Sequence, residues 1–222
     1  LYQFSTRQGI PIKSVETAKY GESERRFQET NLELRLAYNK NFGDLSFSGS
    51  IGGNRMRQFQ KNTDLNSVGG LSLEGFFNIS NSANNPLVVT DENVKGINSL
   101  FAITSFGYKN WLYLDLSARN DWSSTLGVNN QSYFYPAASV SAVFTDLFDM
   151  STNSVLNFAK VRASVAQAGN DTEPYRTSIV YNPEVPNQGP FPRYSIPNSQ
   201  NNADLVNELT TEFEFGVDLR IF

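Results

Sequence analysis

The feature that most constrains this fold is a strict alternation of apolar and polar residues. Near the C-terminus, one face of such a segment holds Phe213, Phe215, Val217, Leu219 and Ile221, and the opposite face holds Glu212, Glu214, Gly216, Asp218 and Arg220. Side chains alternate between the two faces of a β-strand, so a period of two predicts strands. No segment has a helical period over a useful length. The only exception expected is one helical turn within residues 145–150, so the fold is predicted to be all-β.

Six further segments alternate in the same way: residues 31–42, 45–54, 99–109, 112–121, 134–144 and 159–167. The turn residues Gly43-Asp44 and Lys109-Asn110 join the first four segments into two hairpins. One arm, 99–109, is apolar on both faces because Phe101 and Ile103 oppose its other apolar residues. Alternation alone therefore leaves the facing of that arm open.

The connections between these seven strands alternate between short and long. Long ones are expected at residues 55–98, 121–132 and 169–209. Outer-membrane barrels have tight turns at the periplasmic end and long loops at the extracellular end. Phe134 and Phe144 lie ten residues apart on one face, which spans roughly 25 Å along the axis of a tilted strand. That length matches the lipid-facing band, with aromatic residues at each edge.

The same band predicts where the other aromatic residues lie. Tyr38, Phe106 and Tyr108 are expected near the periplasmic edge, and Trp122 near the outer edge. Charged residues recur on the opposite face and would line a wet lumen. A soluble β-sandwich also alternates, with its apolar face turned inward, so a sandwich binding module or adhesin remains an alternative. Seven strands do not close a barrel, so residues 1–222 are expected to be part of one larger barrel domain.

The composition excludes much chemistry. Neither cysteine nor histidine occurs among the 222 residues, which excludes disulfides, thiol nucleophiles, Cys/His zinc sites and a histidine general base. The net charge of −4 argues against a nucleic-acid partner. Glu212 and Glu214, about 7 Å apart on one strand face, have the spacing of an inverting glycosidase pair. No cleft or further acid accompanies them, so we read them as lumen charges and expect no enzyme, metal or cofactor.

Four stretches together resemble one family. They are SLFAITSFGYKNWLYLDLSARNDWSSTLG (99–127), YFYPAASVSAVFTDLF (133–148), LNFAKVRASVAQAGND (156–171) and ELTTEFEFGVDLRIF (208–222). In order and separation they resemble the SusC/RagA family of TonB-linked outer-membrane transporters. The chain departs from the family pattern at Ala137-Ala138, at Val165-Ala166 and at Asn207-Glu208. Residues 1–98 fit the family only as a hairpin with a loop.

The resemblance implies a 22-stranded barrel in the bacterial outer membrane, surrounded by lipid. It also implies an N-terminal plug and a TonB-contacting segment, neither of which is in this sequence, and a SusD-like surface lipoprotein as a lid. The implied function is TonB-dependent active import of an oligomeric nutrient, a glycan or a peptide. A passive porin is the alternative transport function.

Candidate ligand-binding residues cluster where strands are expected to meet the outer rim. They are Arg119, Asp121, Trp122, Tyr133, Tyr135, Asn170 and Asp171. Polar and aromatic side chains of this kind suit a surface for a carbohydrate or a peptide. The simpler interpretation is rim structure, with Trp122 as an interfacial anchor and Asn170-Asp171 as turn residues after Gly169.

Overall fold

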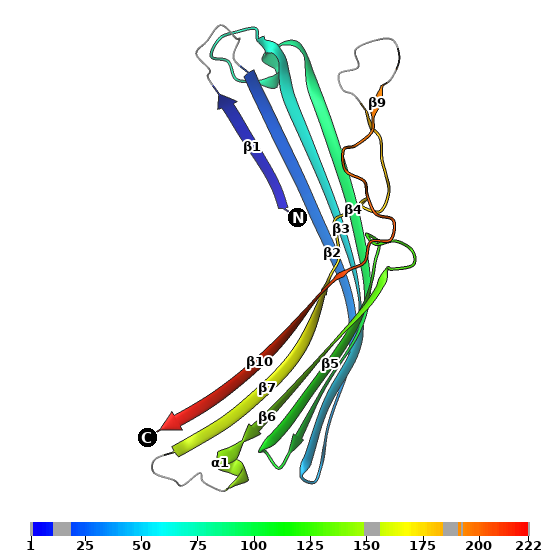
Figure 1. The fold of residues 1–222 in the computed structure, drawn as a ribbon. Helices are drawn as coiled ribbons and strands as arrows, with labels where there is room; N and C mark the ends of the chain where they lie inside the picture. Colours follow the sequence, from blue (N-terminus) through cyan, green and yellow to red (C-terminus); the bar gives the residue numbers. More distant parts are fainter. Residues whose placement is uncertain (1, 11–18, 149–155, 184–190, 192, 222) are drawn as a thin grey trace. The chain divides into compact units, whose positions relative to one another are not determined.

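The computed structural model describes residues 2–10, 19–148, 156–183, 191 and 193–221. Eight strands form one sheet, in the order β1-β2-β3-β4-β5-β6-β7-β10 (Figure 1). Their bounds are β1 (Tyr2–Ile10), β2 (Lys19–Phe42), β3 (Leu45–Leu71), β4 (Ser82–Tyr108), β5 (Leu112–Ser123), β6 (Ser132–Val143), β7 (Leu156–Asn170) and β10 (Glu208–Ile221). Short elements complete the chain: η1 (Ile79–Asn81), α1 (Phe144–Leu147) and a separate pair, β8 (Asn182–Pro183) with β9 (Tyr194–Ser195). The predicted all-β fold is confirmed.

Both predicted hairpins are confirmed. The first turn needs Gly43, whose φ of +59° lies in the left-handed region that glycine adopts without strain. The second turn has Lys109 at φ +47° and Asn110 at φ +61°. Two consecutive left-handed residues suit a tight hairpin, because their twist matches that of the flanking strands. Beyond this turn β4 and β5 pair antiparallel, with Tyr108 opposite Leu112.

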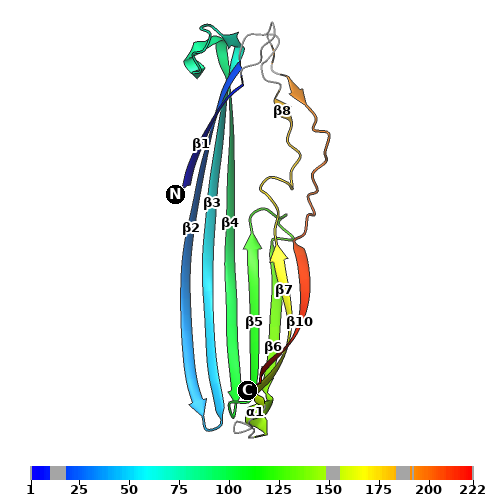
Figure 2. The same cartoon turned by 90° about the vertical axis from the view of Figure 1, so that its left-hand side faces the viewer.

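One prediction is wrong: residues 55–98 are not a long loop. Instead β3 continues to Leu71 and β4 begins at Ser82, so only ten residues connect them. The main sheet has eight strands rather than the predicted seven, because β1 adds a strand that pairs antiparallel with the first part of β2. The long connection between β7 and β10 is confirmed, and it contains the β8–β9 pair (Figure 2). The connection between β5 and β6 lies where it was predicted but has only eight residues, because β5 continues to Ser123.

The predicted helical turn lies one residue earlier than expected. Phe144, predicted to end a strand, instead begins α1, which extends to Leu147. Its ring stacks on that of Phe148 with centroids 6.3 Å apart. The predicted aromatic pair along a single strand is therefore wrong, although Phe134 does lie on β6 and is 55% exposed. Met150, in the predicted turn, lies outside the described residues.

The chain divides into two compact units. One unit comprises residues 1–30, 57–95 and 178–201, and the other comprises residues 31–56, 96–177 and 202–222. In the first unit, polar side chains bridge the strands: Lys61 pairs with Glu92 at 2.7 Å, and the Tyr20 backbone N–H donates to Ser67. Asn81 is buried and closes the β3–β4 connection through hydrogen bonds to the backbone of Leu73 and Phe76.

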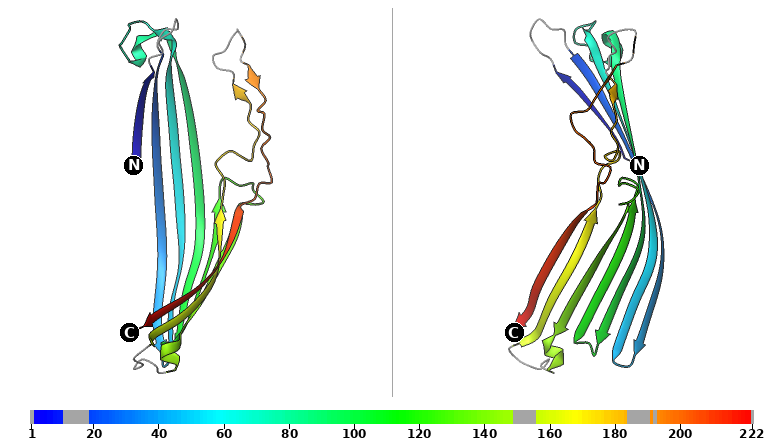
Figure 3. Two further views of the ribbon diagram at one scale, coloured as in Figure 1. Left: turned by 60° about the vertical axis from the view of Figure 1, so that its left-hand side comes forward. Right: turned by 45° about the vertical axis from the view of Figure 1, so that its right-hand side comes forward.

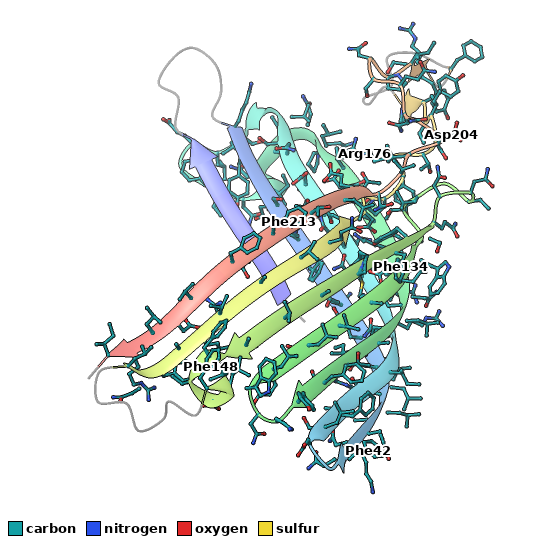
Figure 4. All side chains as sticks on the ribbon, turned by 60° about the horizontal axis from the view of Figure 1, so that its bottom comes forward. Phe42, Phe134, Phe148, Arg176, Asp204 and Phe213 are labelled. Atoms are coloured by element: carbon teal, nitrogen blue, oxygen red, sulfur yellow. The ribbon has the colours of Figure 1, made fainter. Side chains whose placement is uncertain are left out.

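In the second unit, the strand register places apolar residues in continuous rows across the sheet. Figure 4 labels two aromatic residues of this unit, Phe134 on β6 and Phe213 on β10. The rows are Thr104-Leu116-Ala138-Val165-Phe213, Phe106-Leu114-Val140-Ala163-Phe215 and Tyr108-Leu112-Ala142-Val161-Val217. Most of the large side chains in these rows are exposed, Phe215 to 84%. Thr104 is the only member with a non-aromatic hydroxyl. This face is an apolar surface with no protein covering it in the described structure.

The intervening rows form the opposite face, which carries small and polar residues. They include Ser105-Asp115-Ser139-Ser164-Glu214 and Ile103-Ser117-Ala137-Ala166-Glu212. The facing of 99–109, left open by the sequence, is thereby fixed, because Ile103 belongs to this polar face. Neighbouring strands such as β7 and β10 lie side by side in both views of Figure 3. Within the described residues no second sheet covers the apolar face, which argues against the sandwich alternative.

The aromatic residues expected at the periplasmic edge gather at the ends of β2, β3 and β4 where the short turns lie. Phe47 contacts both Tyr38 and Phe106, with ring centroids 6.2 and 5.2 Å apart. Tyr108 packs edge-on against Trp111. Trp122 lies at the opposite end of β5, as predicted. Among the described residues, no helix is long and apolar enough to cross a membrane.

Candidate functional site

Most of the predicted rim residues meet in one polar network at the loop end of β5 and β6. Asp121 is buried and accepts hydrogen bonds from Arg119 Nε at 2.8 Å and from the Tyr135 hydroxyl at 2.6 Å. Arg119 also donates to the hydroxyl of Ser99 on β4 at 2.8 Å. The register produces this cluster, because Arg119 lies opposite Tyr135 and Asp121 opposite Ser99. The network thus joins three adjacent strands.

Two tyrosines extend the network toward β7. Tyr133 is 6% exposed, and its ring stacks on that of Tyr135 with centroids 5.9 Å apart. Both rings lie over Gly169, where an added Cβ would come within 2.7 Å of Cδ2 of Tyr133 and 3.0 Å of Cδ1 of Tyr135. Only glycine lets the rings approach the β7 backbone this closely.

Asp171, which follows the end of β7, binds the residues that end β5. Its Oδ2 accepts hydrogen bonds from the hydroxyls of Ser123 and Thr125, the latter at 3.0 Å. Both hydroxyl-bearing residues are almost fully buried. The carboxylate therefore ties the first residue of the long β7–β10 connection to the start of the β5–β6 connection.

The last residues of the β7–β10 connection are tied to the same place. Asn130 donates from Nδ2 to the backbone oxygens of Asp204 and Leu205, at 3.1 and 3.5 Å. Gly127 lies so close to the backbone oxygen of Ala203 that a Cβ would not fit there. Both ends of the long connection are therefore fastened to the β5–β6 connection.

Two predicted candidates lie outside the network. Trp122 is 37% exposed and lies on the apolar face, one residue out of phase with Arg119 and Asp121. Asn170 lies opposite Glu208 and lines an open pocket of about 300 Å³. The pocket is also lined by Asp171, Thr172, Glu173, Leu205, Val206 and Glu208. A hydrogen-bonded ion pair with Arg176 lowers the pKa of Glu173 at this pocket.

Three members of the network were not predicted: Ser99, Ser123 and Thr125. The spacing of Ser123 and Asp121 by two residues puts both on one strand face, and that signal was available in the sequence. The match of Ser99 to Arg119 required knowledge of the register. Ser123 and Thr125 bond to each other and to Asp171, and Ser99 bonds to Arg119, so these hydroxyls mainly hold structure. Arg119 keeps a 39% exposed side chain that can meet a ligand.

The glutamates with glycosidase-like spacing do not form a catalytic arrangement. Glu212 and Glu214 lie on β10, opposite Ala166 and Ser164 of β7. Both are exposed, and no group of three or more metal-binding side chains occurs in the part of the chain that the structure describes. The residues around them give neither a general acid with a partner nor a metal.

In the second unit, an antiparallel sheet with one apolar and one polar face has the pattern of the wall of a membrane β-barrel. No protein-family model matches the chain. A curated relative, TonB-dependent receptor P39 of Formosa agariphila, is 27% identical over 232 residues, which cover all of this chain and 21% of the relative. The chain thus spans about a fifth of that protein's length.

Solved structures agree on the fold. The RagAB peptide transporter matches with a TM-score of 0.83 at 19% identity, covering 99% of this chain and 25% of that one. The RagAB peptide importer in its closed-closed state gives a TM-score of 0.79 at 20% identity, with the same coverage. The resemblance to TonB-linked outer-membrane transporters of the SusC/RagA type is thereby confirmed, for a segment of the barrel in the outer membrane.

Proposed function

We propose that this chain forms part of the barrel wall of a transporter that imports an oligomeric nutrient, a peptide or a glycan, with energy supplied through TonB. The observation that carries the proposal is the match of nearly the whole chain to a peptide transporter's barrel, at a TM-score of 0.83. The two faces support it, because an apolar row such as Phe106-Leu114-Val140 suits lipid and the alternate polar rows suit a wet lumen.

A SusD-like lipoprotein lid is the partner we propose on the extracellular side. The RagAB structures describe a two-component peptide importer, which supports a lipoprotein lid for this chain. TonB would act on parts of the protein outside this sequence. Surrounding lipid is the remaining partner we propose. The negative net charge argues against binding of nucleic acid.

The pocket beside Asn170 and the exposed part of Arg119 are the substrate-facing surfaces we propose on this segment. Arg119 offers a planar set of donors that suits carboxylates, carbonyl groups or sugar hydroxyls. Asn170 can both donate and accept. Arg119 projects from the polar face, on which cargo in the lumen would pass, and Asn170 lines the pocket at the loop end of β7.

Uptake in cells tests the proposal directly. A strain producing the complete protein is compared with a deletion strain for uptake of fluorescent oligopeptides and oligosaccharides, with and without a protonophore. We expect uptake of one class to require the protein and to stop when the proton gradient collapses. Uptake that is unaffected by the protonophore would identify a passive porin instead and contradict active transport.

Two further measurements test the partner and the surface. Mass spectrometry of the complete protein, purified in detergent from outer membranes, should identify a co-purifying lipoprotein, and its absence would contradict the lid. For the surface, Asn170→Ala is compared with Asn98→Ala, which lies on the apolar face opposite Trp122. Substrate affinity should fall only for Asn170→Ala, and equal uptake by both variants would remove the pocket from the proposal.

A further inference from the structure

An apolar groove of about 500 Å³ is hollowed into the lipid-facing side of the second unit. Its lining includes Leu34, Leu36, Gly53, Leu100, Ala118 and Phe134. A Cβ built on Gly53 would meet nothing closer than Leu100 Cδ2 and the Ser99 backbone oxygen, both at 3.4 Å. The groove therefore exists because small residues leave space between large ones, and no neighbouring group fills it.

The groove continues the apolar face described above. Ala118 lies directly opposite Ala102 on β4 and opposite Pro136 on β6, so one row across the sheet has short side chains. The next row toward the rim has larger side chains, those of Leu100, Asn120 and Phe134. Large side chains thus border a trough that opens toward hydrocarbon.

A hollow on this surface is filled by whatever surrounds it, because an empty one loses dispersion contacts on one side. Water is a poor occupant, since the lining offers almost no hydrogen-bond partners. In the bilayer no hydrophobic gain favours one apolar occupant over another, so the fit of shape decides. A single flexible hydrocarbon chain fits a trough one side chain deep.

The rim end of the groove is polar. Asn120 donates from Nδ2 to the hydroxyl of Ser132 at 3.0 Å, at the edge of the groove. Trp122 lies in the next row, opposite Ser132. Amphipathic rings such as this prefer the level of lipid headgroups. The polar end fixes a direction for an occupant, with its headgroup beside Trp122 and its tail over Ala118.

We propose that this groove is a binding site for one acyl chain of an outer-leaflet lipid, held more tightly than the lipids around the rest of the barrel. The site lies outside the proposed substrate path, since it is on the opposite face of the sheet from Arg119 and Asp121. Filling the trough should therefore remove the lipid without blocking import.

The test uses the complete protein in vesicles containing a phosphatidylethanolamine whose acyl chain carries a diazirine. After illumination, cross-linked peptides are mapped by mass spectrometry. We expect peptides containing Ala102 or Ala118 to be labelled at least tenfold more than peptides containing Ala163, which lies on the same face away from the groove. Even labelling of both regions would show ordinary surrounding lipid and overturn the proposal.

Variants separate the groove from its surroundings. Ala118→Leu and Gly53→Val each fill the trough, and Ala163→Leu adds the same bulk elsewhere on the face. Labelling should fall at least tenfold in both groove variants and stay unchanged in the control, with folding checked by electrophoretic mobility without boiling. Unchanged labelling in the groove variants would overturn the proposal. The proposal would also be overturned if a second copy of the wild-type protein covered the groove, which would be detected as a dimer that Ala118→Leu dissociates.

Discussion

Replacing Asp121 with alanine should loosen the rim where β5 and β6 end. The carboxylate is 7% exposed and accepts the Tyr135 hydroxyl at 2.6 Å and Arg119 Nε at 2.8 Å. Each donor left unsatisfied in a buried place costs about 1–3 kcal/mol. Arg119 is 39% exposed, so water compensates part of its loss. The local opening free energy should therefore fall by about 2–3 kcal/mol in total.

Hydrogen exchange of the complete protein measures this change at the backbone amides of residues 119–135. Under conditions in which reclosing is faster than exchange, about 2–3 kcal/mol corresponds to roughly 30- to 160-fold faster exchange. Asp115→Ala is the matched control, because Asp115 lies on the same strand and face but is exposed. Such surface changes stay within about 0.5 kcal/mol. Equal exchange in the two variants would refute the structural role of Asp121.

Three other substitutions test separate features. Val140→Arg, on the apolar face, should lower the free energy of unfolding in lipid by about 2–4 kcal/mol. Ser139→Arg, on the polar face, should change it little, and similar losses in the two variants would contradict the assigned faces. Gly43→Ala should cost about 1–2 kcal/mol from its left-handed backbone, and Gly43→Asn less, as measured by the same unfolding. Gly169→Ala should lower the free energy of unfolding by about 1–3 kcal/mol, because the added methyl group pushes the ring of Tyr133 away. Tyrosine fluorescence should change with it, and an unaltered spectrum and stability would show that the rings do not need the glycine.

The strands that could be predicted from sequence are those with one face in lipid. On β10 the apolar residues alternate without interruption from Phe213 to Ile221, because lipid demands apolar side chains on one side only. The second hairpin was predicted almost to the residue, since alternation and its two turn residues agree. An alternating pattern reflects the difference between lipid on one face of a strand and water on the other, and it is strong wherever the two faces meet these different surroundings.

The extended parts of β3 and β4 do not have one face in lipid and the other in water. Between Arg57 and Lys95 both faces carry polar residues, and the contacts that hold them are pairs such as Lys61 with Glu92. Where both faces are polar, the period of two disappears from the sequence while the backbone still pairs. The sequence therefore predicted a loop where the structure has strands.

The candidate site was predictable in part for a related reason. Arg119, Asp121, Tyr133 and Tyr135 could be placed on one face by parity within their own strands. Ser99, which bonds to Arg119, comes from β4, and only the register brings the two together. Asp171 follows the end of β7, and its contacts with Ser123 and Thr125 likewise depend on how the strands pair. The separation of Trp122 from this group follows from parity too, since it is one residue out of phase with Asp121.

The polar face also indicates what kind of barrel this wall can belong to. Small barrels of about eight strands fill their interior with side chains. Here two adjacent rows of the polar face hold mainly Ser, Ala and acidic residues, as in Ser105-Asp115-Ser139-Ser164-Glu214, and side chains of this kind suit a wet interior better than a packed one. The wall is therefore suited to a wider barrel with a wet lumen.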